Sequence, residues 1–194
     1  LMGAVLAAGK GTRLRPLTHL LPKPLVPLAG RPLIEYAFQH LHGLGIEHIG
    51  VNAHHLHEVL SDVFQERAPK VSIVLEDELQ GTGGGIRGIA RDMDCQTLVV
   101  INGDALFDFE LGPVLAAHRQ SGSLGTLALR RVPPDAPFGR VGIDDDGRLW
   151  VIAEMSALGT PPEMLSYGAF TGVQIIEREL IERIPDGPCD ILRS

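Results

Sequence analysis

The chain has 194 residues, of which 44% are hydrophobic and 21% charged, and 17 basic against 24 acidic residues give a formal net charge of −7. This composition excludes a disordered chain and a general nucleic-acid or anionic-membrane binder, and no apolar run is long enough to span a membrane. Because two cysteines make no disulfide framework and no signal peptide is recognisable, a reducing cytosol is the expected compartment.

The charge is distributed unevenly along the chain. Residues 1–34 contain no acid and carry +5, whereas the other 160 residues carry −12. The basic residues of this N-terminal segment are Lys10, Arg13, Arg15, Lys23 and Arg31. A local basic segment on an acidic chain indicates a binding site for an anion.

Strand and helix patterns alternate along the first 120 residues. Apolar runs typical of buried parallel strands occur at 4–8, 48–52, 71–75 and 97–102. Helical spacing of apolar residues predicts helices over 33–44, 56–63, 86–92 and 111–120.

The last third of the chain changes character. Residues 140–143 and 148–153 flank the turn signal Asp144–Gly147, which predicts a hairpin. A further strand is expected over 167–176 and a closing helix over 178–184.

These elements predict an α/β fold. Strands that alternate with helices require right-handed crossovers, so we expect a three-layer αβα, Rossmann-like nucleotide-binding fold. Its sheet should be mixed and mainly parallel, with a C-terminal hairpin extension. We expect one domain over 1–194, with a nucleotide-binding half at 1–120 and a sugar-phosphate-binding half at 121–194.

The segment between the first strand and the first helix lacks any periodic pattern. All five basic residues of the N-terminal segment lie in it, and so do five prolines: Pro16, Pro22, Pro24, Pro27 and Pro32. Structureless connections of this length inside a compact domain are usually functional. Gly9–Arg13 follows the carboxyl end of the strand, where open α/β sheets bind ligands. Glycine lets backbone N–H groups approach an anion, and an arginine can bind two phosphate oxygens, so this loop is expected to hold phosphate.

Two familiar glycine motifs do not fit this loop. The dinucleotide fingerprint requires a third Gly or Ala where Leu14 stands, and a helix that Pro16 forbids. The P-loop requires Gly-Lys-Ser/Thr at a helix start, which Gly9-Lys10-Gly11 does not provide.

A longer stretch does fit a known pattern. Leu6–Thr18, followed by Pro22–Leu25 and Pro27–Leu33, resembles the N-terminal signature of the sugar-1-phosphate nucleotidylyltransferases, the nucleotide-sugar pyrophosphorylases. The stretches at 51–56 and 81–86 are most similar to the N-acetylmuramate-1-phosphate uridylyltransferase and mannose-1-phosphate guanylyltransferase branch. The alternative interpretation of the same residues is a proline-rich connecting loop.

The resemblance implies a transferase reaction. An NTP, with UTP and GTP as the expected nucleotides, and a sugar 1-phosphate would give an NDP-sugar and pyrophosphate. The sugar phosphate would attack the α-phosphate in line, in a Mg²⁺-dependent reaction. It assigns Arg13 and Lys23 to the reacting phosphates. It also implies a nucleotide-binding set drawn from the loop and from a base-recognition segment before the predicted helix at 86. The members of that set are Leu6, Ala7, Ala8, Gly9, Gly11, Thr12, Arg13, Gln80, Gly83 and Gly84.

The glycine cluster at 81–85 has two interpretations. A flat backbone after the third strand could approach a planar base, which is the role that the resemblance implies. A flexible linker is the alternative.

Asp104 is the candidate metal ligand. It follows the predicted strand 97–102 and is preceded by Gly103, and a carboxylate in that place suits Mg²⁺. The resemblance assigns it to the Mg²⁺ that bridges the nucleotide phosphates. A simple aspartate turn is the alternative.

The sequence also departs from the family. Many members carry Glu-Lys-Pro after the hairpin, where this chain has Glu154-Met155-Ser156, so the resemblance places Glu154 on the sugar but supplies no lysine. Gly172 matches a family glycine that lies against the sugar. The aspartate that supplies the family's second Mg²⁺ ligand is absent, and we expect that the chain is truncated before it. These departures leave open a catalytically inactive, nucleotide-sugar-sensing module on the same fold; a glycosyltransferase suits the loop less well.

Three of the eight histidines, His54, His55 and His57, fall close together. No acid or cysteine is placed beside them by the sequence, so we predict a solvated helix start rather than a metal site.

Overall fold

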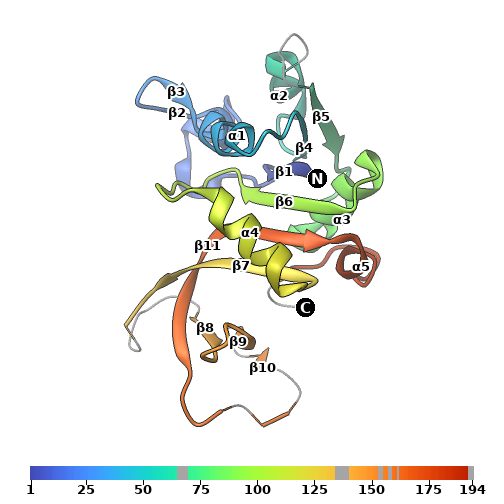
Figure 1. Ribbon diagram of the computed structural model, residues 1–194. Coiled ribbons are helices and arrows are strands. Elements are labelled where there is room, and N and C mark those ends of the chain that lie inside the picture. Colours follow the sequence, from blue (N-terminus) through green and yellow to red (C-terminus); the bar gives the residue numbers. More distant parts are fainter. Residues whose placement is uncertain (65–69, 134–139, 153–154, 157–158, 161, 192–194) are drawn as a thin grey trace.

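The computed structural model describes residues 1–64, 70–133, 140–152, 155–156, 159–160 and 162–191 (Figure 1). These residues form a nine-stranded sheet in the order β10-β9-β8-β11-β6-β1-β4-β5, with β7 also paired to β11, and a separate ribbon of β2 and β3. The strands are β1 (Met2–Leu6), β2 (Pro27–Leu28), β3 (Arg31–Pro32), β4 (His48–Ala53), β5 (Lys70–Leu75), β6 (Thr97–Asn102), β7 (Gly125–Arg131), β8 (Arg140–Ile143), β9 (Leu149–Ile152), β10 (Met155–Ser156) and β11 (Ser166–Glu177). The helices are α1 (Leu33–Gly43), α2 (His57–Phe64), α3 (Gly81–Met93), α4 (Leu111–Ser121) and α5 (Arg178–Ile181).

The sheet is mixed, as predicted. β1 pairs in parallel with β4 on one side and β6 on the other, and β4 pairs in parallel with β5. The long strand β11 then runs antiparallel to β6, β7 and β8, and β8 and β9 form the predicted hairpin. Parallel strands therefore make the N-terminal part of the sheet, and antiparallel strands extend it.

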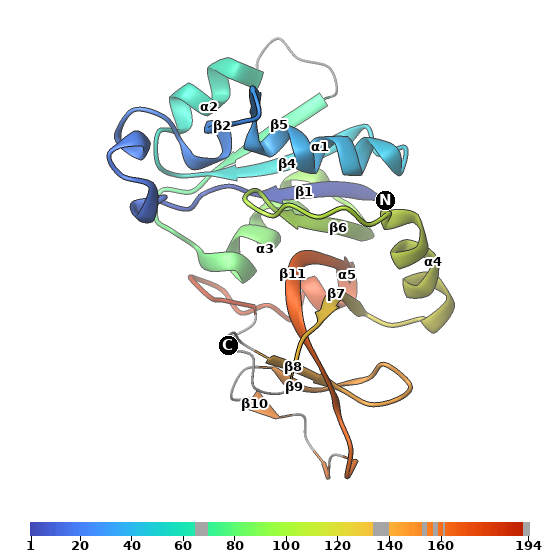
Figure 2. The same ribbon diagram turned by 90° about the vertical axis from the view of Figure 1, so that its left-hand side faces the viewer.

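Helices cover both faces of the parallel strands, which confirms the three-layer prediction. Alternate residues of β1 point to opposite sides, because side chains on a strand alternate. Val5 packs in the core that includes side chains of α1, α2 and α4, whereas Ala4 packs in the core that includes side chains of α3 and α5. α1 and α3 accordingly lie on opposite sides of β1 (Figure 2).

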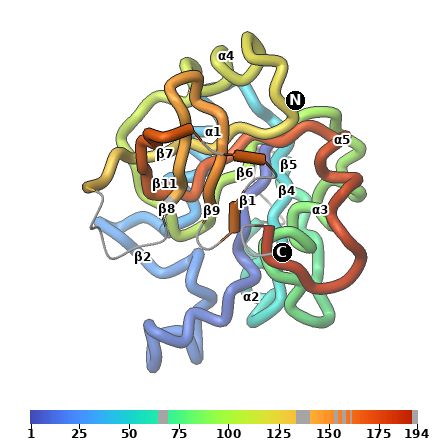
Figure 3. Tube along the Cα trace, turned by 90° about the horizontal axis from the view of Figure 1, so that it is seen from below, coloured from blue at the N-terminus to red at the C-terminus, as the bar shows by residue number. Residues whose placement is uncertain are grey.

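This arrangement brings the carboxyl ends of the parallel strands to one edge. The N–H of Gly103, just after β6, donates to the carbonyl of Leu6 at the end of β1 over 2.9 Å. The long segment that follows β1 leaves from the same edge, and Figure 3 shows it in blue, extending outward from the sheet. None of the helices that the structure describes is long and apolar enough to cross a membrane.

Two features of the N-terminal half differ from the prediction. The segment after β1 is not structureless, because it contains three short 3₁₀ helices, Thr12–Leu14, Leu17–His19 and Lys23–Leu25. A helix was also predicted to begin at residue 86, whereas α3 begins at Gly81. The glycines were expected to precede this helix as a flat backbone segment, but they form its first turns instead, and Gly83, Gly84 and Gly85 are buried.

The β8–β9 hairpin contains a carboxylate with a perturbed pKa. Trp150 Nε1–H donates to Asp144 Oδ2 over 2.8 Å, and the N–H of Arg148 donates to Asp144 Oδ1 over 2.8 Å. These bonds, the Trp150 bond first, lower the pKa of Asp144 below its ordinary value. Hydrogen bonds to the ionised form have this effect, because they favour the charged carboxylate.

Acid should therefore loosen this hairpin. Since the folded pKa of Asp144 lies below the unfolded one, its contribution is present above about pH 4 and is lost as the pH falls through the folded pKa. Trp150 is the single tryptophan of the chain, so its fluorescence reports on this place alone. We expect constant emission from pH 7 to about 4.5 and a change below about pH 4. The variant Asp144→Asn should lack this transition, and an identical acid transition in the variant would contradict the assignment.

Candidate nucleotide-binding site

A cavity of about 450 Å³ opens at the carboxyl edge of the parallel strands. The loop after β1 and the ends of β1, β4, β5 and β6 surround it, together with the first turn of α3. Most of the residues predicted for the nucleotide and the reacting phosphates line it: Leu6, Ala7, Ala8, Gly9, Gly11, Thr12, Arg13, Lys23 and Asp104. The remaining lining residues are Lys10, Leu14, Pro24, Asn52, Glu76, Leu79, Gly81, Thr82, Asn102, Gly103 and Asp190.

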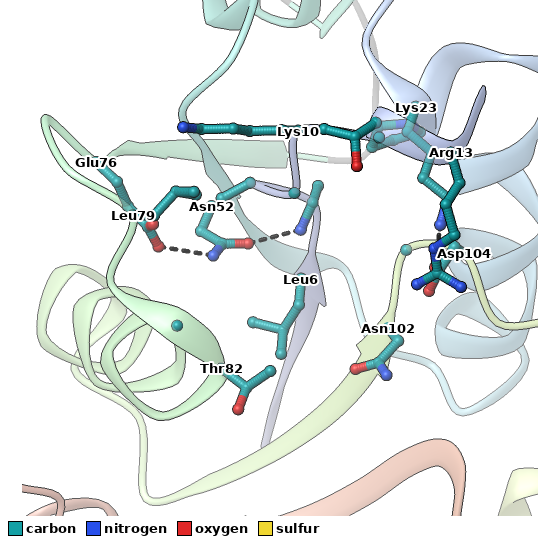
Figure 4. A pocket seen from close by; sticks show the side chains of 18 of the residues that line it. Leu6, Lys10, Arg13, Lys23, Asn52, Glu76, Leu79, Thr82, Asn102 and Asp104 are labelled. Carbon is teal, nitrogen blue, oxygen red and sulfur yellow. Dashed lines mark hydrogen bonds and ion pairs between the residues drawn. The ribbon is translucent and has the colours of Figure 1, made fainter. Parts of the chain in front are cut away.

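The two ends of the cavity differ in chemistry, as Figure 4 shows. Arg13, Lys23 and Asp104 lie together at one end, and Lys23 Nζ donates to Asp104 Oδ2. Their side chains remain open to a ligand, since that of Lys23 is 27% exposed and that of Asp104 48%. This end offers two cations and one carboxylate, which is the composition that a phosphate chain and a divalent cation require.

The loop backbone supplies further donors for an anion. In the part of the chain that the structure describes, the N–H groups of Gly9, Lys10 and Gly11 donate to no other residue. Gly11 has a φ of +59°, and a Cβ there would lie 2.8 Å from Thr18 Cγ2, so only glycine fits. Free N–H groups in a turn form a concave site for phosphate oxygens.

The other end of the cavity is a hydrogen-bonded wall. Asn52, only 3% exposed, accepts from the N–H of Ala7 over 2.7 Å and donates from Nδ2 to Glu76 Oε1 over 2.7 Å (Figure 4). Glu76 Oε2 accepts from the N–H of Gln80 over 3.0 Å. Gly85 makes room for this pair, because a Cβ there would lie 2.5 Å from Asn52 Nδ2. The carboxylate of Glu76 is thus fixed at the cavity wall.

The residues predicted to recognise the base lie outside the cavity lining. Gln80, Gly83 and Gly84 do not line the cavity, whereas their neighbours Gly81 and Thr82 do. The side chain of Gln80 donates to the carbonyl of Glu78 over 3.0 Å.

The buried glycines instead pack against the segment that follows α5. The N–H of Gly83 donates to the carbonyl of Cys189 over 3.0 Å, and a Cβ on Gly83 would lie 2.6 Å from Cys189 Sγ. Thr82 Oγ1 donates to Asp190 Oδ1, which brings Asp190 to the cavity. The red segment therefore runs beside α3 in Figure 3. Close packing of this segment against α3 therefore accounts for the glycines at 81 and 83.

Of the two residues predicted to contact the sugar phosphate, the structure describes only Gly172. Gly172, with a φ of +86°, lies directly against Asn102, since a Cβ on it would be 3.2 Å from Asn102 Nδ2. Asn102 lines the cavity, so Gly172 stands just behind its wall. Glu154 lies outside the described residues.

A metal at this site would depend on Asp104 and on the substrate. Among the described residues there is no group of three or more His, Cys, Asp or Glu side chains that could hold an ion without further ligands. Mg²⁺ in phosphate sites is bound by one or two carboxylates, and phosphate oxygens and water supply the other ligands. The exposed carboxylate of Asp104, beside the two cations, fits that kind of site.

Several lining residues had no assigned role in the sequence. Asn52 ends a buried strand, and a buried polar side chain at a carboxyl strand end is a signal that could have found it. Glu76 follows the last residue of the neighbouring strand β5. Asp190 comes from a segment far along the chain, and no local pattern indicated that it reaches the cavity.

Comparisons with known proteins show the family of this chain. The family model described as nucleotidyl transferase matches residues 2–172. The chain belongs to this family. The chain is 34% identical to UTP–glucose-1-phosphate uridylyltransferase of Synechocystis, over 94% of this chain and 50% of that protein. It is 35% identical to mannose-1-phosphate guanylyltransferase of Mycobacterium tuberculosis, again over 94% and 50%.

A solved structure supports the fold. HddC from Yersinia pseudotuberculosis, complexed with GMP-PN, superposes with a TM-score of 0.77 at 23% identity, covering 99% of this chain and 83% of that one. The chain spans about half the length of these two curated relatives.

Proposed function

We propose that the chain carries the nucleotide site of a sugar-1-phosphate nucleotidylyltransferase, which joins an NTP and a sugar 1-phosphate to give an NDP-sugar and pyrophosphate. One observation carries the proposal: a single cavity combines Arg13, Lys23 and free loop N–H groups at one end with a fixed polar wall at the other. The resemblance of the loop and the two curated relatives support the same reaction.

The residues at the cationic end suit this chemistry. The phosphate oxygen of a sugar 1-phosphate is already anionic at neutral pH, so the reaction needs positioning and charge neutralisation rather than a strong base. Arg13 would bind phosphate oxygens of the NTP, while Lys23 would neutralise charge where the two polyanions meet. Asp104, with phosphate oxygens and water, would hold Mg²⁺, which when bound supplies further charge neutralisation at the nucleotide.

The two halves of the chain would divide the substrates. Residues 1–120 would bind the nucleotide, because the loop and the polar wall both belong to them. Residues 121–194 would bind the sugar phosphate, with Glu154 as a further contact and Gly172 supporting the wall at Asn102.

Glu76 favours GTP as the nucleotide. An ionised carboxylate only accepts hydrogen bonds. Guanine presents two neighbouring donors, N1–H and N2–H, whereas uracil presents one N–H between two carbonyl oxygens that a carboxylate repels. A carboxylate already fixed by Asn52 and Gln80 would therefore select guanine.

The variant Glu76→Gln tests this choice. We expect kcat/KM for GTP to fall about 30-fold, because the second acceptor and its charge are lost. For UTP we expect a rise, since the amide donates to a uracil carbonyl. Glu78→Gln is the matched control, because the exposed side chain of Glu78 does not line the cavity. Equal effects of both variants, or an unchanged GTP-to-UTP ratio, would remove Glu76 from base selection.

The proposed reaction itself is tested by a matrix of four NTPs against several sugar 1-phosphates, with pyrophosphate release as the readout. Release with at least one pair is expected. Calorimetric binding of NTP or NDP-sugar without release in any pair would instead support a catalytically inactive sensing module.

A further inference from the structure

The segment Asn52–His55 makes hydrogen bonds to three other segments around the cavity, at Ala7, Thr18 and Glu76. Of the three histidines predicted at a solvated helix start, only His57 belongs to α2. His54 and His55 precede the helix, and each donates from its ring to a backbone carbonyl of another segment. Their contacts connect the end of β4 to both ends of the cavity.

His55 reaches the anion-binding loop through one intermediate residue. Its Nε2–H donates to the carbonyl of Thr18 over 3.1 Å. Thr18 is 2% exposed, and its hydroxyl donates to the carbonyl of Gly11 over 2.8 Å. A hydrogen-bonded path therefore runs from His55 through Thr18 to Gly11, whose neighbours offer the free N–H groups.

His54 contacts the hydrogen-bonded wall at the other end of the cavity directly. Its Nδ1–H donates to the carbonyl of Glu76 over 2.8 Å. Asn52 holds the carboxylate of the same residue over 2.7 Å and also binds the N–H of Ala7. Glu76 is thus fixed at its backbone and at its side chain by one short segment.

We propose that Asn52–His55 is a positioning segment of the nucleotide site, in which His55 sets the shape of the triphosphate loop and His54 sets the place of Glu76. Neither histidine lines the cavity, so each acts through the residue it holds. A loop that is already ordered loses less conformational entropy when the ligand binds, and this raises affinity without a new contact to the ligand. This inference rests on the proposed function, since it treats the cavity as the NTP site.

The two histidines should have separable effects. His55→Ala should raise KM for GTP and for UTP alike, about fivefold, and leave their kcat/KM ratio unchanged. His54→Ala should instead lower the GTP-to-UTP ratio about fivefold, because Glu76 loses its backbone anchor. His57→Ala is the matched control, and it should change neither quantity.

Three further measurements separate positioning from general stability. His55→Gln keeps a side-chain donor and should restore KM to within about twofold. Thr18→Val removes the hydroxyl at nearly constant shape and, combined with His55→Ala, should be non-additive, since both act on Gly11. KM for the sugar 1-phosphate and the thermal midpoint should stay close to wild type in His54→Ala and His55→Ala.

The outcomes distinguish this inference from the proposed function. Calorimetric Kd values for GTP and UTP are measured in parallel with turnover, so the positioning effects are read even if no pyrophosphate is released. Turnover in the wild type with no change in His55→Ala and His54→Ala would overturn the positioning segment alone. Equal losses for the NTP and for the sugar 1-phosphate, together with a lower thermal midpoint, would overturn it too, because they indicate a purely structural role. A wild-type chain that binds no nucleotide would refute both proposals.

Discussion

Lys23→Ala should reduce pyrophosphate release by about 100-fold or more, with little change in thermal stability. Lys23 is the cation that meets Asp104 at the cavity end where the phosphates would react. Its loss removes one of the two cations that would neutralise the phosphate groups and Asp104, and such electrostatic terms are usually the largest in catalysis. Steady-state kinetics at saturating NTP would measure the fall in kcat.

Asp104→Ala should have a similar effect for a different reason. Removing this carboxylate frees Lys23 but takes away the proposed Mg²⁺ ligand, so raised Mg²⁺ should partly restore turnover in Asp104→Ala and not in Lys23→Ala. Because the two side chains are in contact, the double variant should lose less than the product of the single effects.

Arg31→Ala is the control for lost charge in the same N-terminal segment. Arg31 is exposed, does not line the cavity, and donates to Gln39 over 3.2 Å. We expect its activity within about threefold of wild type, because an exposed, screened charge has small effects. Wild-type rates in Lys23→Ala, or a comparable loss in Arg31→Ala, would contradict a specific role for Lys23.

The parallel half of the fold could be predicted because its signals are local. Buried strands such as β4 and β6 are short apolar runs, and α1 and α4 show regular apolar spacing, so the pattern fixes their bounds to within a residue or two. The position of the loop after β1 at the cavity could be predicted as well, since its glycines and basic residues directly follow a strand end.

Long-range packing explains what the sequence did not reveal. Four glycines in five residues (81–85) argue against a helix by propensity, yet α3 includes them, because tertiary contacts override propensity. Those contacts come from Cys189 and Asn52, residues far from the cluster in sequence. The hydrogen bonds of His54 and His55 were missed for the same reason, since their acceptors, Glu76 and Thr18, belong to other segments.

Gly81→Ala should therefore be among the most destabilising single substitutions in α3, by about 3 kcal/mol. Gly81 has a φ of +69°, and a Cβ on it would lie 2.3 Å from the carbonyl oxygen of Cys189. The backbone cannot yield locally, because Cys189 is held from both sides: its N–H donates to Gln80 over 2.9 Å, and its carbonyl accepts from Gly83. The segment after α5 would have to leave the helix, with the loss of these hydrogen bonds.

Gly88→Ala is the matched control in the same helix. A Cβ there would lie 3.6 Å from Val74 Cγ1, an ordinary contact, and alanine is the better helix former. We expect this variant to be more stable than wild type by about 0.5–1 kcal/mol, measured like the other by urea unfolding.

Thiol labelling adds a local readout to Gly81→Ala. Cys95 is buried, and that burial raises the pKa of its thiol, so labelling in the native state reports on Cys189. Cys189 should react faster in Gly81→Ala than in wild type or Gly88→Ala, because its segment is released from α3. Equal stability and equal labelling in both variants would mean that the glycine cluster does not hold this segment. The packing account of the cluster would then give way to a direct role in binding the base.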